Sequence, residues 1–186
     1  MDAERLARLE LLLDRQDILD CLGHFSRGMD RFDRDLFLST FHPDATIAAG
    51  PYVGDPKGLY DWARPMHEQG QVATHHNLLN HSCEISGDTA HTETYYLFVA
   101  RNRDETNWIA GGRYIDRLER RDGVWRIALR TTVIEWSGLV PTLPVPYADL
   151  PDIHGNGAPG RSKDDPSYRR PLANLRDEQI PPGLED

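Results

Sequence analysis

Hydrophobic positions in the first third of the chain recur at helical spacing. Between residues 3 and 29, five apolar side chains form one stripe: Leu11, Ile18, Leu22, Phe25 and Met29. This pattern predicts a long N-terminal helix that ends near Asp30. A short second helix is expected over residues 34–41 with Asp33 as its N-cap, and a third over residues 57–69. A short strand is expected between them, at residues 46–49.

From residue 72 onward the pattern changes to that of long strands. Four strands are expected, at residues 72–85, 89–103, 107–120 and 124–138, and each is closed by a short turn that contains Gly, Asp or Asn. Three hairpins in series make an antiparallel meander. The strands are roughly 12 to 15 residues long, more than twice the usual length, so the sheet must curl. The pair Gly111-Gly112 is the expected bend or bulge.

Helices that precede a curled antiparallel sheet and gather on one of its faces give an α+β fold. We therefore expect a cone-shaped α+β barrel over residues 1–138, with the curved sheet wrapped around the long N-terminal helix and a pocket at the open end. Residues 139–186 hold nine of the 13 prolines and show no sustained period. They are expected to form a C-terminal extension, either an arm packed on its own or a neighbouring subunit, or a partly disordered tail.

Composition and charge disfavour several classes of partner. Acidic side chains outnumber basic ones by 30 to 21, and a net charge of −9 repels nucleic acid. Two cysteines are too few for a disulfide scaffold. No apolar run approaches the roughly 20 residues of a membrane span, and the first residues lack the order of a signal peptide. We expect a cytoplasmic protein that binds neither nucleic acid nor membrane.

Asp30 is the first candidate for chemistry, because it lies at the expected C-terminal end of the first helix. A carboxylate there faces the negative end of the helix dipole, and an apolar pocket would add desolvation. Both effects are expected to raise the pKa of Asp30 toward that of a useful general base. The alternative is a surface turn aspartate, or a cap for the second helix.

Four histidines lie on the first two long strands: His75, His76, His81 and His91. His75 and His81 share a strand face but stand roughly 20 Å apart at about 3.3 Å per residue. His76 points to the opposite face, so the spacing does not predict a three-ligand metal site. Only one of His75 and His76 can face the pocket. Asn80 shares the face of His76 and could orient either that ring or a ligand.

Arg130 is the third candidate, since it lies among apolar residues in the middle of the last strand. One interpretation is a donor inside the pocket that stabilises an anion or orients the substrate. The other is an arginine on the outer face, paired with Glu93 or Glu119. Aromatic side chains are also numerous on the strands, and alternation places only some of them inside, as core or as the wall of an apolar ligand site.

Several segments match a known pattern: residues 27–33, 41–45, 74–80, 85–90, 112–114 and 120–126. In them the chain resembles the SnoaL-like families of the nuclear transport factor 2-like superfamily, over roughly residues 5–138. Those families include dehydratases of the scytalone and bile-acid type, a lindane dehydrochlorinase and formaldehyde-releasing lyases that act on lignin dimers. The resemblance identifies the fold but says little about the reaction, because proteins with this fold have many different functions.

The resemblance implies that Asp30 and His76 form an Asp–His catalytic pair, and that Arg130 matches an arginine beyond the Asp-Gly-x-Trp turn. One position departs from the pattern. Relatives often carry Lys or Tyr five residues before the aspartate, where this chain has Phe25. Phe25 cannot donate a proton, so the leaving group must find its acid elsewhere, such as a tyrosine or Arg130.

The leading hypothesis is a cofactor-independent lyase, of the dehydratase or formaldehyde-eliminating type, that acts on a small apolar, aromatic or polycyclic molecule. Asp30, His76 and Arg130 are the expected catalytic residues. The expected substrate-binding residues are Phe25, Asn80, Tyr96, Trp108 and Tyr52. No metal or cofactor is expected, and the chain is expected to form a homodimer or homotrimer. The alternatives are an isomerase on the same scaffold and a non-catalytic binding protein, in which Asp30 and His76 would lie beyond hydrogen-bond reach.

Overall fold

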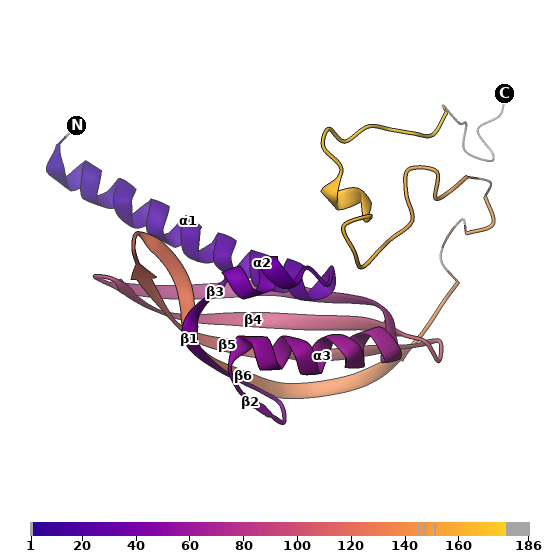
Figure 1. The fold of residues 1–186 in the computed structure, drawn as a ribbon, viewed down its shortest axis with the longest axis horizontal. Helices are drawn as coiled ribbons and strands as arrows, with labels where there is room; N and C mark the ends of the chain where they lie inside the picture. Colours follow the sequence, from indigo (N-terminus) through magenta and orange to yellow (C-terminus); the bar gives the residue numbers. More distant parts are fainter. Residues whose placement is uncertain (1, 145, 147, 151, 178–186) are drawn as a thin grey trace. The chain divides into compact units, whose positions relative to one another are not determined.

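The computed structural model describes residues 2–144, 146, 148–150 and 152–177. The chain divides into a first unit, Met1–Thr142, and a second unit, Leu143–Asp186. In the first unit three helices lie on one face of a six-stranded sheet, as Figure 1 shows. This arrangement confirms the predicted α+β fold class.

The first helix, α1 (Ala3–Asp30), begins at Asp2, whose carboxylate accepts a hydrogen bond from the Arg5 backbone N–H. Only the C-terminal half of α1 is buried, and its buried apolar residues are Ile18, Cys21, Leu22, Phe25 and Met29. Leu11 was expected in the same stripe but is 42% exposed. The reason is that the N-terminal turns of α1 extend away from the sheet (Figure 1).

Gly28 allows α1 to pack closely against α2 (Arg34–Ser39). A Cβ atom at Gly28 would lie 2.6 Å from the backbone nitrogen of Phe37 and 2.7 Å from its Cα. Replacing Gly28 by alanine is therefore expected to lower the free energy of unfolding by about 1–3 kcal/mol, measured by chemical denaturation. Gly23→Ala is the matched control, because nothing lies within 4 Å of its Cβ. That change should stabilise α1 by about 0.5–1 kcal/mol, and equal losses in both variants would contradict the close approach.

Both shorter helices are capped by aspartates, of which Asp33 was the expected N-cap. Asp33 accepts from the Leu36 backbone N–H at the start of α2, and Asp55 caps α3 (Pro56–Gly70). The prediction placed the end of α2 at residue 41, but the helix ends at Ser39 and the chain enters a strand. Phe41, expected in the helix, instead pairs with the last strand, so the aromatic ring reaches the core from a strand.

The sheet order is β2-β1-β6-β5-β4-β3. Its strands have these bounds: β1 Phe41–Ala49, β2 Tyr52–Gly54, β3 Gln71–Ser86, β4 Thr89–Asn102, β5 Thr106–Arg121 and β6 Val124–Pro141. Strands β3 to β6 form the predicted antiparallel meander. Strand β1 begins earlier than predicted and pairs in parallel with β6, while β2 was not predicted. Pro43 is tolerated because the β1–β6 register shifts between Phe41 and Thr46, where no ladder donor is needed.

The sheet is curved but does not close, because β2 and β3 form its two edges. The predicted barrel is therefore an open cone. The predicted bulge is confirmed, since the β5–β6 register shifts between Gly111 and Gly112. A Cβ atom at Gly112 would lie 2.0 Å from the carbonyl oxygen of Val133, so only glycine fits there.

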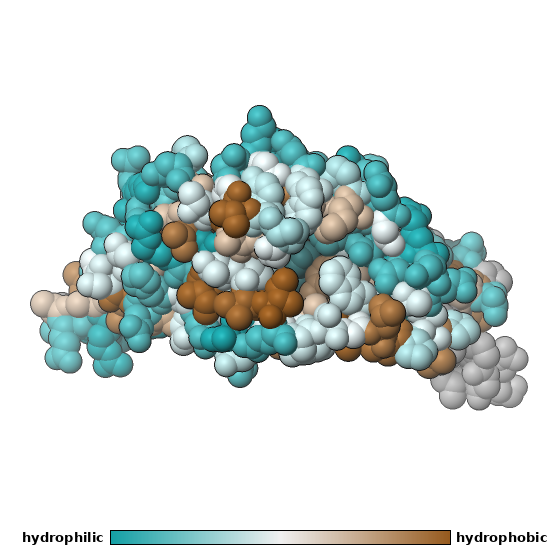
Figure 2. Space-filling view, turned by 90° about the horizontal axis from the view of Figure 1, so that it is seen from below, coloured by the Kyte–Doolittle hydropathy of each residue, from teal (hydrophilic) through white to brown (hydrophobic). Residues whose placement is uncertain are grey.

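The core lies between the helices and the inner face of the sheet, where Phe25, Phe37 and Phe41 form a cluster with ring centroids 5.3–5.9 Å apart. Many large apolar side chains elsewhere remain exposed, and Figure 2 shows hydrophobic groups that interrupt a mostly hydrophilic face. No helix in the described ranges is both long and apolar enough to cross a membrane.

The second unit is held by local hydrogen bonds around one short 3-10 helix, Pro166–Tyr168. Asp165 accepts from the backbone N–H of Gly160, and the side-chain oxygen of Asn156 accepts from that of Leu175. These contacts connect separate segments within the described part of the predicted C-terminal extension. Residues 145, 147, 151 and 178–186 of that extension lie outside the described residues.

Candidate active site

A cavity of about 360 Å³ lies between the inner face of the sheet and the helices α1 and α3. Its wall is mainly apolar and aromatic, and includes Phe25, Tyr96, Phe98, Trp108 and Tyr114. The few polar side chains in the wall include two histidines, one on α3 and one on β3. A mostly apolar cavity with a few placed polar groups is typical of a small-molecule site.

Asp30 and His76 meet at the wall of this cavity. Nδ1 of His76 lies 2.6 Å from Oδ1 of Asp30, and the backbone N–H of His76 donates to Oδ2 at 2.8 Å. The hydroxyl of Thr74, which is fully buried, forms a further hydrogen bond to this carboxyl group. The end of α1 and the start of β3 are thus joined through one carboxylate, which fixes the plane of the His76 ring.

The pKa of Asp30 is lowered, so the expectation of a raised pKa is wrong. Burial is the largest single influence and raises the pKa of this carboxyl group. The positive charge of His76, its two hydrogen bonds and the bond from Thr74 act in the opposite direction and together outweigh burial. Asp30 therefore stays ionised at neutral pH, and its carboxylate orients the ring of His76 through their hydrogen bonds.

This lowered pKa predicts how stability depends on pH. Because the folded state favours the ionised form of Asp30, its contribution is fully present above the unfolded pKa of about 4. The contribution is lost as the pH falls through the lowered pKa of the folded state. Below about pH 4, the free energy of unfolding of the wild type should therefore fall more steeply with decreasing pH than that of Asp30→Asn.

The matched control for that titration is Asp17→Asn, since Asp17 is exposed on the same helix. Chemical denaturation at a series of pH values measures all three proteins. The control should follow the wild-type slope. Parallel slopes for Asp30→Asn and the wild type would show that the carboxylate of Asp30 is not stabilised by folding.

Arg130 lies beneath the cavity, and it is not among the residues that line it. The residue is 1% exposed. Its guanidinium forms two hydrogen bonds of 2.7 Å with Asp116 and lies 4.0 Å and 4.2 Å from the ring centroids of Phe25 and Tyr114. The outer-face alternative is therefore wrong, because position 130 of β6 faces inward and α1 covers it.

The outer-face acids that were considered for Arg130 have other partners. Glu93 pairs with Arg113, and Glu119 pairs with Arg117 and Arg121. Because Arg130 is neutralised by Asp116 and covered by two aromatic rings, the structure offers it no direct path to a ligand in the cavity.

Among the expected substrate-binding residues, Phe25, Tyr96 and Trp108 line the cavity. Tyr52 does not. Its hydroxyl donates to the carbonyl oxygen of Asp55, and its ring stacks on Trp62 with centroids 6.1 Å apart. Tyr52 thus supports Trp62, which is itself part of the cavity wall.

Asn80 is exposed and lies outside the cavity. The β3–β4 register shifts between Leu78 and His81, so one extra residue breaks the alternation along β3. Alternation counted from His76 placed Asn80 on the inner face, but beyond the bulge the faces exchange. His81 consequently points inward and makes a hydrogen bond of 2.8 Å with Thr94.

His67 on α3 is a cavity residue that the sequence interpretation missed. It is 7% exposed, its Nδ1 lies 2.7 Å from the side-chain oxygen of Gln71, and its ring centroid is 6.1 Å from that of His76. The sequence contains a pattern that could have identified His67. On α3, Leu59, Ala63 and His67 follow one another at four-residue spacing and so share the buried face of the helix. Within the described ranges, no group of three or more His, Cys, Asp or Glu side chains is arranged to hold a metal ion.

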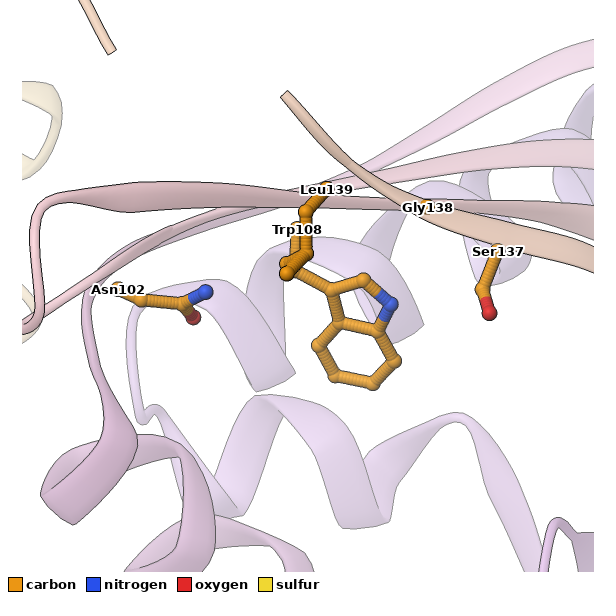
Figure 3. A pocket seen from close by; sticks show the side chains of 5 residues that line it. All are labelled: Asn102, Trp108, Ser137, Gly138 and Leu139. Carbon is orange, nitrogen blue, oxygen red and sulfur yellow. The ribbon is translucent and has the colours of Figure 1, made fainter. Parts of the chain in front are cut away.

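A second, shallower hollow lies near the ends of β5 and β6 (Figure 3). Asn102, Trp108, Ser137, Gly138 and Leu139 line it, and the indole of Trp108 projects from the strands toward the helices. Trp108 also lines the main cavity, so it borders both spaces. Among the described residues, none of the side chains that line this hollow is titratable, and the candidate for chemistry is therefore the cavity that holds His76.

Comparison with known families agrees with this geometry. The model of the SnoaL-like domain matches residues 10–131, which is more than half of the chain. The chain belongs to the SnoaL-like family. No protein in a comparison with curated sequences matches it.

Solved structures share this SnoaL-like fold at low sequence identity. The hexachlorocyclohexane dehydrochlorinase LinA type 3 from Novosphingobium barchaimii is 20% identical with a TM-score of 0.67, and the match covers 74% of this chain and 99% of that one. A scytalone dehydratase-like protein from Novosphingobium aromaticivorans is 18% identical with a TM-score of 0.62, over 71% and 91% of the two chains. The Kfla4162 protein from Kribbella flavida is 18% identical with a TM-score of 0.62, over 69% and 95%. These likenesses confirm the fold.

Proposed function

We propose that the protein is a cofactor-independent lyase that eliminates water or formaldehyde from a small aromatic or polycyclic substrate. The observation that carries the proposal is the hydrogen bond of 2.6 Å between Asp30 and His76 at the wall of an apolar cavity. The names of two structural neighbours, a dehydrochlorinase and a scytalone dehydratase-like protein, both denote elimination reactions. An elimination begins when a base removes a proton from the substrate, and it is favoured when the base is held next to the substrate in a site that excludes water.

His76 is the proposed base. Because the Asp30 carboxylate accepts from Nδ1, the ring proton of neutral His76 lies on Nδ1, and Nε2 carries the lone pair. When Nε2 removes a proton from the substrate, the ring becomes an imidazolium. The ionised Asp30 stabilises that charge and holds the ring in place, as the orienting acid of a catalytic triad does.

The surroundings of His76 favour proton transfer to and from an apolar molecule. The side chains of Asp30 and His76 are only 12% and 10% exposed, and the ring of Phe98 packs against His76 with centroids 4.8 Å apart. Water is thus largely kept away from the dyad, which strengthens the attraction between the carboxylate and the imidazolium.

A non-catalytic binding protein needs no hydrogen bond between these two residues, so their contact argues against that alternative. An isomerase would use the same base but return the proton to another atom of the substrate. The two enzyme classes differ in the mass of the product, which is unchanged by isomerisation and reduced by elimination.

Mass spectrometry of a substrate panel tests the proposal. The purified protein would be incubated with β-hydroxy ketones and hydroxymethyl-bearing aromatic compounds of two or three rings. We expect at least one of them to lose the mass of water or formaldehyde without added metal or cofactor. Binding throughout the panel with no change in any compound would overturn the proposal in favour of a carrier, and a rearranged product of equal mass would indicate an isomerase.

A further inference from the structure

The N-terminal half of α1 carries a row of leucines that are exposed to solvent. Asp14 is the first residue of this helix that is not exposed, and its carboxylate accepts hydrogen bonds from Arg120 and from the indole of Trp125. Before Asp14, the helix projects beyond the sheet (Figure 1). Four leucines of this stretch, Leu6, Leu9, Leu12 and Leu13, are 46%, 41%, 61% and 64% exposed. Large apolar side chains gathered on one surface are typical of a contact with another molecule.

Three of these leucines face away from the sheet. Successive residues of a helix are rotated by about 100°, so Leu6, Leu9 and Leu13 share one side of α1. Ile18 and Leu22, which are buried in the core, lie on the opposite side. The helix therefore has two apolar faces. Its C-terminal half buries one of them within the first unit, and its N-terminal half presents the other to solvent.

The spacing of the exposed face is that of a coiled coil. Leu6, Leu9 and Leu13 follow one another at intervals of three and four residues, and thus occupy positions a, d and a of a heptad. The next d position holds Gln16 and the next a position holds Asp20, so the apolar seam ends there. A second helix with the same leucines would pack its side chains into the spaces between these. Another copy of this chain supplies such a helix.

The charged residues beside the seam favour a second copy in parallel orientation. Arg5 lies at position g and Glu10 at the following position e, and neither side chain forms an ion pair with the described residues. In a parallel pair, position g lies beside the following position e of the other helix, so Arg5 of each copy would meet Glu10 of the other. An antiparallel pair instead places g beside g and e beside e. No acid occupies a g position along this seam and no base an e position, so that pair would gain no ion pair.

We propose that residues 5–16 form a parallel two-stranded coiled coil with the same residues of a second copy of the chain. The proposal does not depend on the elimination chemistry, since none of these residues lines the cavity that holds His76. In such a pair each sheet lies on the outer side of its own helix, because the seam and the buried face of α1 are opposite. The seam is short, so we expect a dissociation constant of roughly 1–100 µM.

Sedimentation equilibrium of the full chain, at concentrations on either side of this value, tests the seam. Leu6→Glu/Leu13→Glu places carboxylates in the seam and should raise the dissociation constant by at least about 100-fold. Leu11→Glu is the matched control, because Leu11 is 42% exposed but lies at position f, on the side away from the seam. It should change the constant by less than about threefold. Equal masses for the wild type and Leu6→Glu/Leu13→Glu at every concentration would overturn the proposal.

Exchanging the flanking charges tests the orientation. Arg5→Glu turns two attractions into repulsions and should weaken association by about three- to tenfold at low ionic strength. Arg5→Glu/Glu10→Arg restores both attractions in a parallel pair, so its dissociation constant should return to within about twofold of the wild type. In an antiparallel pair the double variant has no attraction to restore. Failure of this rescue would therefore overturn the parallel coiled coil, even if the leucine variant dissociates.

Discussion

Replacing His76 by asparagine is expected to lower kcat for the elimination by about three orders of magnitude. The asparagine amide nitrogen can take the place of Nδ1 and keep the hydrogen bond that His76 makes with Asp30 at 2.6 Å. Nothing then occupies the position of Nε2, so the carboxylate keeps its partner while the proposed base is gone. The dissociation constant of the substrate should change by less than about threefold, because the apolar wall that binds it is intact. Steady-state kinetics and a binding titration with the substrate from the mass-spectrometric screen measure both quantities.

His75→Asn is the matched control for this experiment. It makes the same chemical change one residue away, on an exposed side chain that points to the opposite face of β3. Turnover in the control should stay within about twofold of the wild type, since it touches nothing in the cavity. If His76→Asn retained more than a tenth of the wild-type kcat, or if both variants lost activity equally, His76 would not be the base.

The long elements were predictable because each follows from a local pattern. Apolar residues at helical spacing located α1 and α3, and Gly87 and Gly123, which have φ of 59° and 77°, mark two of the hairpin turns. Strand β2 was missed, and β1 was predicted only over residues 46–49, because the pairing of these strands is not local. The parallel contact of β1 with β6 joins Phe41 to Ile127, and no short-range periodicity carries that information.

The site was predicted in part, and the limits have physical causes. Asp30 lies at a helix end and His76 at an inward position of β3. The resemblance predicted that the two residues form a pair, and in the structure they are hydrogen-bonded. Asn80 was misplaced because a bulge reverses the parity of a strand and leaves no mark in the sequence. The depth of Arg130 depends on which helix covers β6, and the pKa of Asp30 depends on contacts with His76 and Thr74 that only the folded chain brings together.

Replacing Arg130 by methionine is expected to lower the free energy of unfolding by about 3–5 kcal/mol. Arg130 and Asp116 are 1% and 2% exposed, and each satisfies the charge of the other through two hydrogen bonds of 2.7 Å. Without the guanidinium, the Asp116 carboxylate is left buried and unpaired. Methionine fills much of the space between the rings of Phe25 and Tyr114. The loss of stability therefore reports the unpaired charge of Asp116 rather than the creation of a cavity. Chemical denaturation near neutral pH gives the value.

The double variant Arg130→Met/Asp116→Leu separates a lost attraction from an uncompensated charge. Removing both members of a buried pair is often neutral or stabilising, so the double variant should recover most of the stability that Arg130→Met loses. Arg113→Met is the exposed control, because Arg113 pairs with Glu93 and Glu135 on the outer face. This substitution should lower the free energy of unfolding by no more than about 1 kcal/mol. If Arg130→Met were as mild as this control, Asp116 would have to find another partner or lose its charge. If the double variant were as unstable as the single one, the pair would stabilise the fold through its attraction and its contacts with the two rings.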